Sequence, residues 1–236
     1  MVDINTITIK PEWAGQVAVC IAGGASLTPY QVNAVKGLKT IVINDGYKIA
    51  PWADILYACD PRWWHWQKDL QEFKDFKGYK LQHFCHAKLN KVADMVAYDD
   101  FEKIRATGAP YPGIDCIVSS GECGFDPSPD RIKHGGNSGY QALHVALHLG
   151  AKVIIMLGYD MHAKHKTSHW FGEHPHPFNR YNAQLYEVWQ QEFFALENAA
   201  IERGQKIINC SPGSRLDCFE KADLIETLRG LNVGNY

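Results

Sequence analysis

Residues 134–160 read HGGNSGYQALHVALHLGAKVIIMLGYD, and this stretch decides the fold. A glycine-rich loop leads to Ser138, which matches a capping box with the glutamine three residues later. The apolar spacing of a helix continues to Gly150, a common stop signal, and residues 153–157 then form a continuous apolar run. Such a run is typical of a strand covered on both faces. We therefore expect a loop, a helix and a buried strand ending near Asp160, at the sheet edge where α/β proteins bind ligands.

Three earlier apolar runs each end in glycine or in a polar residue. They are residues 17–22 before Gly23 and Gly24, residues 38–43 before Asn44, and residues 54–59 before Asp60. Because parallel strands place their carboxyl ends at one edge, we expect an α/β fold with a mostly parallel, Rossmann-like sheet flanked by helices. Residues 1–236 would form a single nucleotide-binding domain. The first turn, with Ser26, could present backbone N–H groups to a phosphate, or it could be only a tight strand-to-helix turn.

Composition favours a soluble protein that acts on small molecules. The chain has 236 residues, of which 46% are hydrophobic, and its net charge of −2 lacks the basic excess typical of nucleic-acid-binding proteins. Its seven cysteines include no C-x-x-C pair, and its first residues lack the apolar core of a signal peptide. No apolar run reaches the length of a membrane span. We therefore expect a cytoplasmic protein with no nucleic-acid partner and no membrane span.

A histidine-rich segment at about residues 161–178 is expected to form a lid over the strand ends. Its two prolines exclude a continuous helix, and loops of this length are often functional. The histidines are His162, His165, His169, His174 and His176. Zinc binding is one interpretation, although neither an H-E-x-x-H motif nor a cysteine pair accompanies them. General acid/base catalysis or contact with phosphates is the interpretation that we favour.

An aromatic segment, PRWWHWQ, occupies residues 61–67. Its three tryptophans could line a cleft at the sheet edge, but packing of a helix is the interpretation that we favour. A homo-oligomer is also possible, with this segment as the contact surface.

In chain order, several motifs resemble a known superfamily. They are AGGASL, IVIND, LYACD, GGNSGYQALHVALHLGAKVIIMLGYDM, SHWFGEHP and INCSPGSRL. The chain is similar to the bacterial sialyltransferases that decorate lipooligosaccharide using CMP-sialic acid, and to the 6-hydroxymethylpterin diphosphokinase MptE-like group, which includes phage and bacterial proteins. The resemblance implies a Rossmann-like sheet with a lid.

The resemblance also implies which residues bind a nucleotide or nucleotide-sugar donor. The matching positions are Gly23, Gly24, Ser26, Asn44, Ser138, Gly139 and Asp160. We add Asn137 from the same loop and His162 and His165 from the lid. The histidine just past the SHWFG segment is the base of the sialyltransferases, which His174 matches best, with His169 as the rival.

The chain departs from the sialyltransferase pattern at the strand ends. Gly23 and Asp60 stand where that family has asparagine, and two lid tyrosines are not evident. Asp60 and Asp160 could instead hold Mg²⁺ beside phosphates, because that ion prefers hard carboxylate ligands. Asp60 would then be a catalytic residue of the MptE-like type.

Three functions follow from these observations. The first is a glycosyltransferase-like enzyme that passes a sugar from a CMP-sugar type of donor to a hydroxyl acceptor. The second is an MptE-like, Mg²⁺-dependent diphosphokinase that uses ATP. The third is a protein that binds a nucleotide without catalysis, because a fold does not establish a chemistry.

Overall fold

A computed structural model describes residues 6–84, 113–162, 169–172 and 183–235 of the chain. Most of the expected lid, including the candidate residues His165 and His174, lies outside these described residues. No helix in the described ranges is long and apolar enough to cross a membrane.

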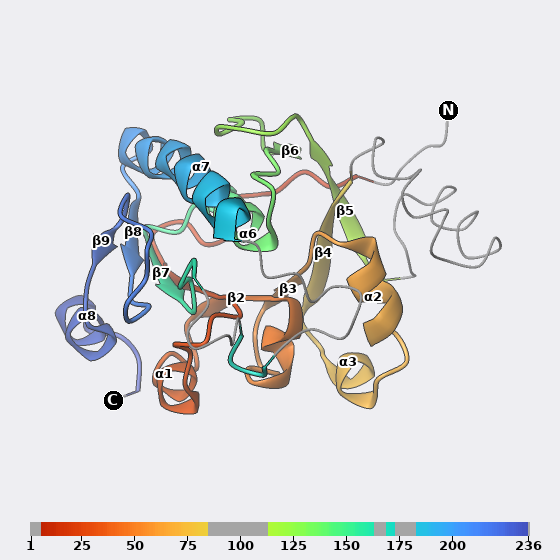
Figure 1. Ribbon diagram of the computed structural model, residues 1–236, viewed down its shortest axis with the longest axis horizontal. Coiled ribbons are helices and arrows are strands. Elements are labelled where there is room, and N and C mark those ends of the chain that lie inside the picture. The colour runs from red at the N-terminus through yellow and green to blue at the C-terminus, as the bar shows by residue number, and fades with distance from the viewer. Residues whose placement is uncertain (1–5, 85–112, 163–168, 173–182, 236) are drawn as a thin grey trace.

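Nine strands form one sheet in the order β6-β5-β4-β3-β2-β1-β7-β8-β9, and all neighbouring strands are parallel (Figure 1). They are β1 (Val17–Ile21), β2 (Lys39–Ile43), β3 (Ile55–Tyr57), β4 (Tyr79–Phe84), β5 (Asp115–Ser119), β6 (Arg131–Ile132), β7 (Val153–Leu157), β8 (Lys206–Asn209) and β9 (Glu220–Lys221). The sequence-based prediction of an α/β fold with a parallel, Rossmann-like sheet is confirmed.

The direction in which strands are added reverses next to β1. After β1 the chain adds β2 to β6 on one side, and α6 (Ser138–His148) then leads it back to β7 on the other side. β1 and β7 pair in register, from Val17 opposite Val153 to Ile21 opposite Leu157. In open α/β sheets, ligands bind at such a switch point, outside the carboxyl ends of the strands.

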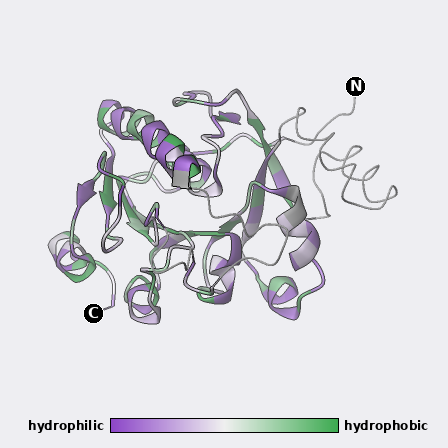
Figure 2. Cartoon of the chain, in the orientation of Figure 1, coloured by the Kyte–Doolittle hydropathy of each residue, from purple (hydrophilic) through white to green (hydrophobic). Residues whose placement is uncertain are grey.

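Helices cover both faces of the sheet (Figure 1). One face carries α6 and α7 (Ala183–Glu202), and the other carries α1 (Pro29–Ala34), the 3-10 helix η1 (Asn44–Lys48), α2 (Pro61–Gln67), α3 (Gln71–Asp75) and α8 (Leu224–Leu231). Successive strand residues alternate between the two cores: in β1, Cys20 joins the core under α6, and Val19 and Ile21 join the other. Figure 2 shows the corresponding hydropathy, with apolar strands between helices of mixed character.

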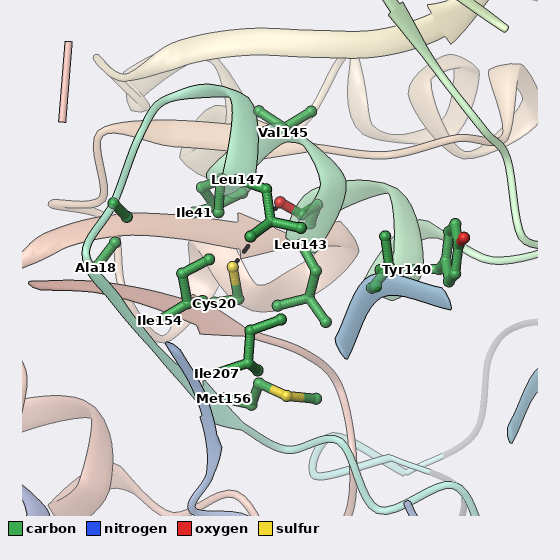
Figure 3. Packing of buried hydrophobic residues seen from close by; sticks show 14 of the residues in the cluster. Ala18, Cys20, Ile41, Tyr140, Leu143, Val145, Leu147, Ile154, Met156 and Ile207 are labelled. Carbon is green, nitrogen blue, oxygen red and sulfur yellow. Dashed lines mark hydrogen bonds between the residues drawn. The ribbon is translucent and has the colours of Figure 1, made fainter. Parts of the chain in front are cut away.

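The helix α6 is buried along its whole length. Leu143 and Leu147 pack with Cys20 of β1 and with Ile154 and Met156 of β7 (Figure 3). The Cys20 thiol lies 3.9 Å from the carbonyl oxygen of Ala142, and burial raises its pKa to about 12. The packing therefore makes α6 a rigid support for the loop at its N-terminus.

The cap of α6 differs from the prediction. Asn137, rather than Ser138, is the N-cap: it is extended, and its side-chain oxygen accepts from the Tyr140 amide at 2.8 Å. Asparagine and serine are comparable caps, so local preference could not choose between them. Gln141 does not complete a capping box, because its side-chain oxygen accepts from the Tyr57 hydroxyl and its side-chain nitrogen donates to a carbonyl oxygen.

Gly150 follows the helix with φ at +82°, as expected of a glycine stop. Residues 220 and 221 pair with β8 as strand β9. The last helix, α8, begins after this strand at Leu224, and Asp223 is its N-cap.

Two of the three tryptophans of α2 pack a helix, as favoured from the sequence, whereas Trp66 is 38% exposed. Trp63 and Trp64 are buried in the core on the sheet face opposite α6 and α7. The indole N–H of Trp63 donates to the Asp45 carboxylate at 3.0 Å, and that of Trp64 donates to the Ala58 carbonyl at 3.1 Å. Both rings are therefore part of the scaffold.

Candidate functional site at the sheet switch point

The candidate site lies at the carboxyl ends of β1, β2, β3 and β7, where the N-terminus of α6 also arrives. Ser138, the first residue of α6, connects three of these elements. Its hydroxyl accepts from the Cys59 amide, just after β3, at 3.0 Å and lies 3.4 Å from the side-chain oxygen of Asn44, just after β2. The structure therefore brings together Asn44 and Ser138, which are 94 residues apart in the sequence.

Asn44 has an unusual backbone conformation. Its φ of +50° lies in the left-handed region, which few non-glycine residues adopt and where asparagine is tolerated best. The bond from the Ser138 hydroxyl holds its side chain at the strand end. Strained residues that the surroundings hold in place are concentrated at functional sites, which fits the prediction for Asn44.

The first turn of α6 directs backbone N–H groups toward this edge. The Tyr140 amide donates to the Asn137 side chain. The amides of Ser138 and Gly139 lie in the first turn of α6, where the helix has no earlier carbonyl group to accept from them. A Cβ at Gly139 would lie 3.0 Å from the Tyr159 ring, so the glycine permits close packing of α6 on the second residue after β7. Helix N-termini with such amides bind anions.

Asn137 serves the scaffold rather than an open site. Its side-chain oxygen caps α6, and its side-chain nitrogen donates to the Gly135 carbonyl at 3.1 Å. Each end of the Asn137 amide thus has one protein partner, and the contact between Asn137 and a donor stays a prediction.

The turn after β1, residues 23–27, is bonded to the end of β7. The Gly24 amide donates to the Gly158 carbonyl at 2.8 Å. The amide and the hydroxyl of Ser26 donate to the two carboxylate oxygens of Asp160, at 2.7 and 2.5 Å. Asp160 is only 3% exposed. Three of the predicted donor-binding residues thus bind one another or the adjacent strand end.

One histidine of the expected lid lies against this turn. A Cβ at Gly23 would be 3.0 Å from Nδ1 of His169, and the Trp170 amide donates to the Gly23 carbonyl at 3.0 Å. His169 also pairs with Gly24 in an antiparallel bridge and stacks on Phe171, with ring centroids 5.0 Å apart. The four described residues 169–172 therefore lie against the turn after β1.

The other lid candidates are placed differently. Nε2 of His162 lies 3.1 Å from the Gly213 carbonyl, so this ring is held at the loop after β8. His165 and His174 lie outside the described residues. Of the two candidate bases, His169 is the one that the described structure brings to the switch point.

The loop after β8 contributes residues that were not named in advance. The Ser211 hydroxyl accepts from the Tyr159 amide at 2.8 Å, and the Ser214 hydroxyl donates to the Tyr159 carbonyl at 2.6 Å. The side-chain nitrogen of Asn209 donates to the Ser214 hydroxyl at 2.8 Å. The polar pattern CSPGS at a strand end was the available signal. These bonds hold the backbone of Tyr159, the residue before Asp160, in place.

The predicted magnesium ligands form no complete site among the described residues. Within these ranges, no group of three or more His, Cys, Asp or Glu side chains is placed to hold a metal ion. Asp60 is partly exposed after β3, and both oxygens of Asp160 already accept from Ser26. Metal dependence therefore stays a hypothesis.

Comparisons with known proteins add no family to this geometry. Neither a protein-family model nor a curated protein matches the chain. The resemblance to sialyltransferases and to the MptE-like group remains a prediction from the sequence motifs.

Proposed function

We propose that the protein binds a nucleotide or nucleotide-sugar donor at the switch point and transfers a group from it to a hydroxyl acceptor. The observation that supports this proposal most is the convergence at Ser138. Its hydroxyl joins the ends of β2 and β3 to a helix N-terminus that lies beside β1. Nucleotide-binding α/β proteins use this edge of the sheet in the same way.

In this proposal, the donor phosphate binds at the N-terminus of α6. The amides of Ser138 and Gly139 supply N–H donors, and the helix dipole favours a negative charge there. Asn44, held by Ser138, contacts the nucleoside through its amide. Charge stabilisation of this kind also serves the leaving phosphate, because its negative charge grows as the bond to the transferred group breaks.

His169 is the proposed general base. Its imidazole takes the proton of the acceptor hydroxyl while that oxygen attacks the donor carbon, and the nucleotide leaves with the electron pair of the broken bond. The stack on Phe171 and the contact with Gly23 hold the ring in one place. Removing a general base typically lowers turnover about 10²- to 10⁴-fold.

A thermal-shift screen tests binding first. CMP, CDP, UDP, GDP and ATP are each added with Mg²⁺ and with EDTA, because a ligand at about a hundredfold above its Kd stabilises a fold by about 2.7 kcal/mol. Stabilisation by a cytidine nucleotide in EDTA supports the glycosyltransferase-like function. No shift with any nucleotide in either condition would contradict the proposal.

The base is tested with the donor that the screen identifies. His169→Asn is compared with His65→Asn, which changes a partly exposed histidine on α2. We expect His169→Asn alone to lose turnover while nucleotide binding is kept. Wild-type turnover in His169→Asn would exclude His169 as the general base and leave His174 as the candidate.

Asp60 supports the diphosphokinase as a second candidate. It places a partly exposed carboxylate directly after β3, where Mg²⁺ bound to ATP could find a ligand. Stabilisation by ATP that requires Mg²⁺ and is lost in Asp60→Asn would favour this reaction over glycosyl transfer. Binding of a nucleotide without product formation from any acceptor would instead favour the non-catalytic function.

A further inference from the structure

The turn at residues 23–27 holds an internal carboxylate in the position of a bound anion. Both donors of Ser26 point to Asp160, one to each carboxylate oxygen. Gly24 makes room for this group: a Cβ there would lie 2.5 Å from Oδ1 of Asp160. The glycine turn after β1 therefore has the N–H and O–H donors of Ser26 directed at a carboxylate of its own chain.

Asp160 is fixed through its backbone as well as through its side chain. Its carbonyl accepts from the Arg215 amide at 2.9 Å, and the preceding Tyr159 is bonded on both sides to the loop after β8. Charge-assisted bonds from an amide and a hydroxyl to a carboxylate are stronger than neutral ones. The carboxylate is thus a permanent part of the turn.

We propose that residues 23–27 form an anion-binding turn whose resident anion is Asp160. This inference rests on the proposed function in one respect: the phosphate of the donor is then excluded from the turn and binds at α6. Asp160 is a positioning residue in this arrangement. It holds the turn in shape, and its charge disfavours a second phosphate beside the turn, so the neighbouring ligand group should be neutral, such as a hydroxyl.

Removal of the resident anion tests the proposal by chemical rescue. Asp160→Ala leaves the two Ser26 donors without their acceptor, and formate or inorganic phosphate should occupy the vacated position. At about ten times its Kd, such an anion should raise the melting temperature of the variant by about 3–6 °C. Wild type and Asp160→Asn should show no comparable rise, because a side chain of the original size fills the position in both.

Matched solutes separate rescue from general salt effects. Sodium chloride at equal ionic strength and neutral formamide should not stabilise Asp160→Ala, because chloride lacks the two oxygens and formamide lacks the charge. If Asp160→Ala does not accumulate as folded protein, refolding yield from urea in formate is compared with that in chloride. Equal behaviour of Asp160→Ala and wild type in formate, or equal yields in the two salts, would overturn the proposal.

A second set of variants needs no added anion. Ser26→Ala, Asp160→Asn and the double variant form a cycle, in which the double variant should lose little more melting temperature than Asp160→Asn alone. Fully additive losses would show that the two residues act independently and would contradict the resident-anion arrangement. These experiments use formate, phosphate and stability only, so their failure is distinguishable from failure of the nucleotide screen.

Discussion

Acidification should destabilise the protein through His144, a histidine buried in the middle of α6. The ring is fully buried and stacks on Phe125, with centroids 4.4 Å apart. The Lys133 amide donates to Nδ1 at 3.3 Å, and Nε2 lies 3.2 Å from the Asp126 carbonyl oxygen and 3.4 Å from the Asp126 amide nitrogen. We assign the ring proton to Nε2, because the carbonyl contact is the shorter one and Nδ1 already accepts. The neutral ring is therefore satisfied on both sides. A second proton, on Nδ1, would face the N–H of Lys133.

The size of the effect follows from the pKa. Burial, with smaller contributions from His148 and Arg203, lowers the pKa of His144 from 6.5 to about 3, and hydrogen bonding to Asp126 opposes this shift. Below pH 6.5 the unfolded chain binds a proton at this position, whereas the folded protein does not until near pH 3. Stability is thus complete above pH 6.5 and is lost as the pH falls toward 3. At about 1.4 kcal/mol per pH unit, pH 4.5 costs about 2.5 kcal/mol relative to pH 7.

Urea denaturation at pH 7 and pH 4.5, followed by tryptophan fluorescence, measures this loss. Carboxylates also titrate in this range, so the informative quantity is the free energy of unfolding of wild type minus that of His144→Asn. We expect this difference to shrink by about 2.5 kcal/mol between pH 7 and pH 4.5.

Leu147→Ala is the matched control on the same helix. It should be destabilised by about 2–5 kcal/mol, because it removes a buried leucine, and should keep the wild-type pH dependence. If wild type and His144→Asn lose stability in parallel as the pH falls, the buried neutral imidazole is not the cause.

Three further predictions concern single positions. Gly24→Ala should lower the free energy of unfolding by about 1–3 kcal/mol in thermal or urea denaturation, because its Cβ would lie 2.4 Å from the Gly158 carbonyl oxygen; an unchanged stability would contradict this packing. Asn137→Ala should cost about 0.5–2 kcal/mol through loss of the α6 cap, and a wild-type value would contradict the cap assignment. Alkylation at pH 8 should modify exposed Cys123 well before Cys20, whose pKa is raised to about 12 by burial; mass spectrometry of peptides reads the order, and early labelling of Cys20 would contradict its burial.

Local patterns in the chain were sufficient to predict the fold class. The apolar runs at β1, β2 and β7 predicted buried parallel strands, and the glycine and polar residues after them predicted a shared ligand-binding edge. These features depend on burial and on backbone preference, which are properties of short segments. Two-residue strands such as β9 carry too little pattern to be recognised from the sequence.

Tertiary structure decided which side chains meet at that edge and what each one does. Asp160 matches a donor-binding position in the sequence, and in the fold its carboxylate accepts from Ser26, 134 residues away. Asn137 and Ser138 are both residue types that can cap α6. In the structure Asn137 is the N-cap, and the Ser138 hydroxyl bonds to the ends of β2 and β3 instead. A polar side chain can form several alternative hydrogen bonds of similar strength. Which of them forms depends on where the fold places the ends of strands that are distant in the sequence. For this reason the sequence was enough to predict the sheet edge of the candidate site, and the fold determined which polar groups at that edge already have protein partners.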